Sequence, residues 1–168
     1  MAVIDVGSAA TDRASYKLNG YTWISYDNTA NDTGTLDTFE VFAVSGYGLS
    51  GFKAGTFSGS SATFTNRDYE SIGNVTAGSK QTFGGLNCDV TSGDKIGCYY
   101  SGGRIEGITS GGGNLASKVA DTFGAGEVTE YGIASGDSIS LYATGATVAA
   151  GSLPLKNVFG RPFSGVFR

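Results

Sequence analysis

The chain has 168 residues, including 28 glycines, nine tyrosines, ten phenylalanines and only two prolines. That length fits one domain without a disulfide framework, and an apolar content of 40% excludes a disordered chain. The net charge of −4 argues against general nucleic-acid binding. The first residues lack a basic segment followed by an apolar core, and no apolar run approaches the ~20 residues that span a bilayer. We therefore expect neither a visible signal peptide nor a membrane-inserted helix.

Catalytic groups are scarce. The chain has no histidine, which excludes a Ser-His-Asp triad, a Cys-His pair and the usual zinc sites. The glycines at 111–113 lack the lysine of a phosphate-binding loop. Glu127 and Glu130 are the best carboxylate pair for glycoside hydrolysis, but they fall on opposite faces of a predicted strand. We expect no enzymatic activity and no cofactor.

An internal repeat is the most informative pattern. Residues 90–100 (VTSGDKIGCYY) recur as residues 133–143 (IASGDSISLYA), each with an apolar residue, a Ser-Gly-Asp turn and then alternating apolar positions. Glycine supplies a positive φ and aspartate bonds nearby amides, so each copy predicts strand, tight turn, strand. We expect buried side chains at Val90, Ile96, Ile133, Ile139 and Leu141.

Short strands joined by glycine-rich turns predict an all-β fold, a single jelly-roll-like antiparallel β-sandwich. Alternation or β-forming composition places strands at residues 2–6, 15–26 (interrupted at Asn19-Gly20), 34–45, 52–57, 62–65, 69–75, 80–90, 94–100, 104–108, 127–134 and 137–144, the last two pairing around the second turn. Residues 34–45 are apolar on both faces, so a loop or a neighbouring subunit should cover the outer face. One short helix is expected at residues 114–123, with Asn114 as its N-cap and Leu115, Val119 and Phe123 on one face.

Two features have alternative interpretations. Trp23, the only tryptophan, is a core or core-edge residue or else a platform on which a sugar ring stacks. The loop at residues 27–34 (DNTANDTG) is dense in side-chain oxygens. It binds Ca²⁺ or uses the same oxygens in Asx turns, and its spacing does not fit an EF-hand.

Cys88 and Cys98 fall on the predicted inward face around the first turn. If this turn is a hairpin, the two thiols are opposite each other and can form a disulfide. If it is an arch between two sheets, they face each other across a core about 10 Å thick and cannot. We favour the arch, and with it two reduced, buried thiols.

The end of the chain differs from the rest. Residues 1–152 form the predicted sandwich domain, and residues 153–168 form an extended basic, aromatic arm with both prolines, which disfavour a central strand. No acid follows Asp137. Exposed phenylalanines invite aggregation, so either the acidic body of the domain or a neighbouring subunit should cover the arm. We expect the second, with these partner-binding residues: Phe159, Arg161, Phe163, Phe167 and Arg168.

The pattern apolar-x-x-Gly-Asp-x-apolar-x-x-Tyr resembles the corner between sheets in jelly-roll and immunoglobulin-like sandwiches. With residues 75–83 (VTAGSKQTF) and 90–97 (VTSGDKIG), the chain over residues 1–150 resembles small β-sandwich structural proteins of tailed bacteriophages. The resemblance implies a capsid-decoration or tail-associated protein with an assembly role and no enzymatic one. It assigns no binding residue and does not include the arm.

Three functions follow from these observations. The first is a virion structural protein, assembled in the host cytoplasm and placed on the virion surface, whose partners are its own copies, a major capsid protein or a tail protein. The second is a carbohydrate-binding module that uses Trp23 or the tyrosines for stacking. The third is a subunit of an extracellular filament, which has open rather than closed symmetry. Exposed aromatics in a row beside Asp or Asn would favour the carbohydrate module.

Overall fold

The computed structural model describes residues 2–147, and these form fourteen β-strands without a helix. The strands belong to three sheets in which all paired strands are antiparallel. In spatial order, the first sheet contains β1 (Val3–Gly7), β14 (Leu141–Thr147), β4 (Gly34–Phe42) and β7 (Lys80–Val90). The second sheet contains β11 (Glu127–Val128), β6 (Thr63–Val75), β5 (Leu49–Ser60), β8 (Lys95–Tyr99), β3 (Thr22–Ser25), β10 (Asn114–Lys118) and β12 (Gly132–Ser135). The third contains β13 (Ser138–Ile139), β9 (Arg104–Ile108) and β2 (Ser15–Leu18).

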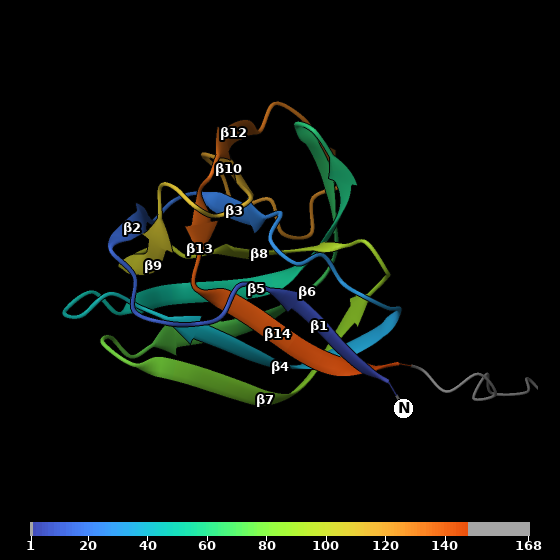
Figure 1. Cartoon of the computed structure of the whole chain (residues 1–168), viewed down its shortest axis with the longest axis horizontal. Coiled ribbons are helices and arrows are strands. Elements are labelled where there is room, and N and C mark those ends of the chain that lie inside the picture. The colour runs from blue at the N-terminus through green and yellow to red at the C-terminus, as the bar shows by residue number, and fades with distance from the viewer. Residues whose placement is uncertain (1, 148–168) are drawn as a thin grey trace, which may run out of the picture.

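Eight of the strands pair as nested hairpins. Strand β1 pairs with β14, β3 with β8, β4 with β7 and β5 with β6, and successive pairs alternate between the first and second sheets. Figure 1 shows β1 beside β14 in the first sheet, with β8 and β3 in the other layer. The predicted all-β antiparallel sandwich is confirmed, and nested pairing of this kind is compatible with the predicted jelly roll.

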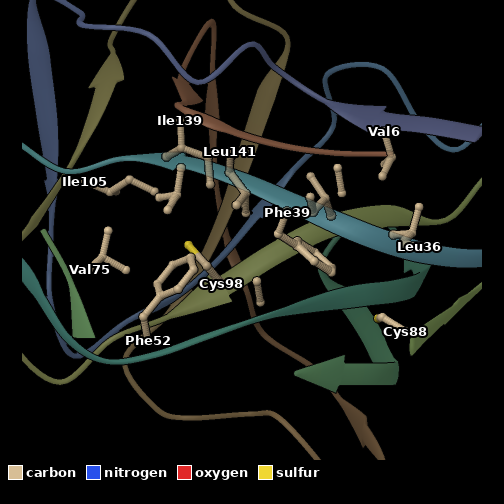
Figure 2. Packing of buried hydrophobic residues seen from close by; sticks show 14 of the residues in the cluster. Val6, Leu36, Phe39, Phe52, Val75, Cys88, Cys98, Ile105, Ile139 and Leu141 are labelled. Carbon is tan, nitrogen blue, oxygen red and sulfur yellow. The ribbon is translucent and has the colours of Figure 1, made fainter. Parts of the chain in front are cut away.

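The main core fills the space between the first and second sheets. Phe39 of β4, Phe52 of β5 and Leu141 of β14 are fully buried in it, and Figure 2 shows their side chains gathered between the ribbons. Burial of each such side chain contributes about 1.5–3 kcal/mol relative to exposure. The outer face of β4 differs, because Phe42 is only half-buried.

A second core lies on the opposite face of the seven-stranded sheet. Strands β11 and β12 occupy the two edges of this sheet, yet only residues 129–131 separate them in the chain. Since so few residues span at most about 14 Å, the sheet must curl until its edges approach each other. Edge-to-face aromatic pairs fill the curl, with ring centroids 5.1 Å apart for Phe57 and Phe123 and 5.0 Å apart for Phe64 and Tyr131.

Both Ser-Gly-Asp turns are arches between sheets. The first connects β7 to β8 and the second connects β12 to β13, with Gly93 at φ +87° and Gly136 at φ +81° as predicted. Four of the five residues expected to be buried around these turns are at most 2% exposed: Val90, Ile96, Ile139 and Leu141. The prediction for Ile133 was wrong. It is 43% exposed because β12 is an edge strand.

The first arch separates the two cysteines, as the arch interpretation predicts. Cys88 lies on β7 in the first sheet and Cys98 lies on β8 in the second, and both are buried free thiols. Figure 2 shows them well apart, with Cys98 near Phe52. Burial raises the pKa of the Cys88 thiol to about 12, and burial likewise raises the pKa of Cys98. Neither thiol is therefore a nucleophile at neutral pH.

The predicted helix at residues 114–123 was wrong. Asn114–Lys118 is strand β10, which pairs with β3 on one side and β12 on the other. The three apolar residues expected on one helix face point to different places. Leu115 is in the main core, Phe123 is in the second core and Val119 is 74% exposed.

Three strand predictions were also wrong in detail. Residues 15–26 form β2 and β3, which belong to different sheets, and residues 127–144 do not pair around the second turn. The predicted break at residues 66–68 is absent, because β6 is continuous through them. A register shift between Thr56 and Phe57 occurs there, and the Asn66 amide bridges it by donating to the carbonyl oxygens of Thr56 at 3.0 Å and Asp68 at 3.1 Å.

Candidate binding surface

The guanidinium of one arginine lies over two tyrosine rings on the surface. The guanidinium carbon of Arg104, at the start of β9, is 4.4 Å from the ring centroid of Tyr16 and 4.1 Å from that of Tyr47. Tyr16 comes from β2 and Tyr47 from the loop between β4 and β5, so three distant segments meet here. We call these three residues the arginine clamp.

Backbone bonds fix the clamp in place. Residues 15–18 of β2 pair with residues 104–107 of β9, which sets Tyr16 close to Arg104. The Arg104 amide donates to the Tyr47 carbonyl at 3.3 Å, and the Val44 amide donates to the Arg104 carbonyl at 3.0 Å. A further bond from the Tyr47 amide to the Val44 carbonyl at 2.8 Å closes the turn that carries Tyr47. The stacked geometry therefore rests on main-chain contacts, which favours a preorganised side chain.

Among the cations of residues 2–147, the Arg104 side chain alone makes no hydrogen bond or ion pair within that part of the chain. The other seven bond to described residues: Arg13, Lys17, Lys53, Arg67, Lys80, Lys95 and Lys118. A guanidinium carries five N–H donors around its edge, and no described residue accepts a bond from those of Arg104. Within the described residues, the clamp is an unused set of charged donors.

Apolar side chains flank the clamp. Leu18, which pairs with Arg104 across the two strands, is 49% exposed, while Tyr47 and Tyr16 are 47% and 44% exposed. The Trp23 indole donates to the Leu18 carbonyl at 3.0 Å, and its ring stacks on Tyr21 with centroids 5.1 Å apart. Trp23 is half-buried against the main core, which agrees with the core-edge interpretation. No sequence pattern indicates the clamp beyond the residue types, because only the fold brings its three segments together.

The aspartates of the repeat hold the arches. Asp94 is almost fully buried, accepts a bond from the Thr91 amide at 2.9 Å and forms an ion pair with Arg67 of β6. Asp137 likewise pairs with Lys17 of β2, and both of these side chains are largely buried. Each Ser-Gly-Asp turn is thus tied by its aspartate to a cation on another strand, so these carboxylates act in the structure.

The other candidate sites from the sequence are the Glu127 and Glu130 pair and the loop at residues 27–34. Glu127 and Glu130 are exposed, and Glu130 lies 3.7 Å from Lys118. In the loop at residues 27–34, Asp27 accepts bonds from Ser8 and the Gly113 amide, and Asn31 bonds the Asp5 amide and the Val3 carbonyl. These contacts connect the loop to distant segments of the chain, so its side-chain oxygens have a structural use that is not the local Asx turn. No group of three or more metal-ligating side chains occurs among the described residues.

The predicted partner-binding residues of the arm lie outside the described residues: Phe159, Arg161, Phe163, Phe167 and Arg168. Their role stays a prediction. Within residues 2–147, no helix is long and apolar enough to cross a membrane.

No family model, characterised protein or solved structure matches this chain.

Proposed function

We propose that the chain is a non-enzymatic structural protein of the virion type, which assembles with its own copies into a protein lattice on the virion surface. The observation that carries the proposal is the clamp with its exposed apolar neighbour Leu18. Tyrosine, tryptophan and arginine are enriched at the centres of protein interfaces, where a few such residues dominate the binding energy. The prediction that the arm at residues 153–168 binds a neighbouring subunit also supports assembly.

The jelly-roll pairing is compatible with this function. Capsid proteins and lectins both use that architecture, so the fold alone does not choose between assembly and sugar binding. The sequence adds an absence of histidine and a resemblance to phage structural proteins over residues 1–150. A filament subunit would use the same contacts in an open repeat, which electron microscopy of the assembled protein distinguishes from a closed one.

Carbohydrate binding is the second candidate, because four aromatic side chains at this end of the molecule are exposed or half-buried. Sugar stacking needs an open ring face beside hydrogen-bonding side chains. One face each of Tyr16 and Tyr47 is occupied by Arg104, and Tyr21 and Trp23 cover each other. The nearby Asn19 amide already donates to the Ser101 carbonyl at 2.9 Å. These contacts favour a protein partner.

The test is the native mass of the full chain over a wide range of protein concentrations, measured by mass photometry and native mass spectrometry. We expect discrete oligomers whose population increases with protein concentration. A monomer at every concentration, together with saturable binding to an oligosaccharide array, would replace assembly with the carbohydrate function.

A further inference from the structure

We propose that the arginine clamp is the contact through which one copy of the chain binds an acidic side chain of a second copy. This inference rests on the proposed function and names the surface and the chemistry of the partner.

Stacking makes Arg104 a suitable anchor for a carboxylate. The centroids of the two rings lie 4.4 and 4.1 Å from the guanidinium carbon, so contact with them already reduces the rotamer freedom of Arg104 before binding. A planar guanidinium presents parallel N–H donors that match the two oxygens of a carboxylate. The ligand that fits the free edge is therefore an aspartate or glutamate side chain.

The charge of the molecule indicates where that carboxylate comes from. Residues 2–147 contain eight Lys and Arg side chains against fifteen Asp and Glu side chains, a net charge of −7. The five ion pairs in this region each use one acid, so most acids have no cation partner there. A second copy thus presents many carboxylates to Arg104, the cation that has no partner within residues 2–147 of the first copy.

The flanking residues favour a protein over a free acidic sugar. Leu18 is 49% exposed next to Arg104, and an apolar side chain gains from burial under a partner's surface but has no group for a sugar hydroxyl. Tyr16 and Tyr47, whose rings both contact the guanidinium, are exposed to a similar extent. An aromatic and apolar rim around one charged group is the arrangement of an interface hot spot.

The experiment is sedimentation equilibrium of the full chain and three variants at low and moderate salt. Arg104→Ala and Arg104→Lys should each weaken self-association by about 30-fold, because loss of a hot-spot residue has an effect of that size and lysine lacks the planar fork. Salt screens both the contact of Arg104 with a carboxylate and the repulsion between two acidic copies, so each variant is compared with the wild type at the same salt concentration. Lys80→Ala is the matched control, since it removes one exposed cation that is not part of the clamp.

The control should associate like the wild type, and circular dichroism should show that all four proteins are folded and unfold cooperatively. A wild type that self-associates together with Arg104 variants that associate equally well would overturn this inference and leave the proposed function standing. A wild type that is monomeric at every concentration would overturn both. Binding of a galacturonate oligosaccharide to such a monomer, lost in Arg104→Ala, would assign the clamp to a sugar carboxylate instead.

Discussion

At the scale of single residues, the buried charges of the arches are the most consequential polar contacts. Asp94→Ala leaves the Arg67 guanidinium and the Thr91 amide without their acceptor. Removing one partner from such a pair should lower the free energy of unfolding by about 2–4 kcal/mol, with Arg67 retaining some solvent contact. Chemical denaturation measures this change.

The comparison for Asp94 is a surface pair. Lys80 and Glu40 lie 2.9 Å apart, and the Lys80 side chain is 49% exposed. Lys80→Ala should therefore change the unfolding free energy by no more than about 1 kcal/mol. Equal effects of the two substitutions would show that the arch does not depend on Asp94.

Glu106 gives the expected pH dependence. Its side chain is 5% exposed, and burial, with a smaller contribution from Asp12, raises its pKa above the ordinary value. The folded state thus binds this proton more tightly than the unfolded state. Glu106 should therefore lower stability as the pH rises from below its ordinary pKa through its raised one.

Unfolding free energies of the wild type and Glu106→Gln, measured from acidic to neutral pH, isolate this contribution. Glutamine is neutral and can still accept the Arg13 amide bond of 3.3 Å. The unfolding free energy of the variant should increase relative to that of the wild type as the pH rises through the raised pKa of Glu106. Above that pH the difference should stay constant. If the difference in unfolding free energy were independent of pH, it would contradict the raised pKa of the Glu106 carboxylate.

At the scale of elements, the first arch depends on a left-handed glycine. Gly93 has φ +87°, and a Cβ added there would meet no atom within 4 Å, so the cost of a side chain is conformational alone. Gly93→Ala should lower the unfolding free energy by about 1 kcal/mol, and Gly93→Asn by less, because asparagine tolerates this region. Thermal and chemical unfolding test the order Gly, Asn, Ala, and an alanine variant as stable as wild type would contradict it.

How far the sequence predicts each element follows from how local its determinants are. Strands β7 and β9 have the predicted bounds, because period-2 alternation and flanking turn residues define them locally. The arch around Gly93 was predictable because glycine and aspartate in that order specify the turn. The helix predicted at residues 114–123 was wrong because the helical spacing of Leu115, Val119 and Phe123 is a local signal. The pairing of β10 with β3 and β12 decides the conformation instead.

The candidate site was less predictable than the fold. Tyr16, Tyr47 and Arg104 are separated in the chain, and no short spacing connects them. They meet only because β2 pairs with β9 and the loop after β4 bonds to the start of β9. Non-local pairing of this kind leaves no periodic pattern in the sequence, so residue type was the only signal.

At the scale of the whole molecule, the described sandwich has its own core. Its outermost nested pair joins β1 to β14. The arm at residues 153–168 follows this closed pairing. Its three phenylalanines would each gain about 1.5–3 kcal/mol from burial, which we attribute to a neighbouring subunit. The alternative is that the arm packs on the acidic body of its own domain.

Assembly through the arm and the clamp is the central claim, and sedimentation equilibrium of the full chain beside residues 1–152 tests it most directly. We expect the full chain to form discrete oligomers, and the shortened chain to remain a folded monomer with an unchanged cooperative unfolding transition. The claim would be contradicted if the full chain were monomeric and the shortened chain unfolded, because the arm would then belong to the core of its own domain.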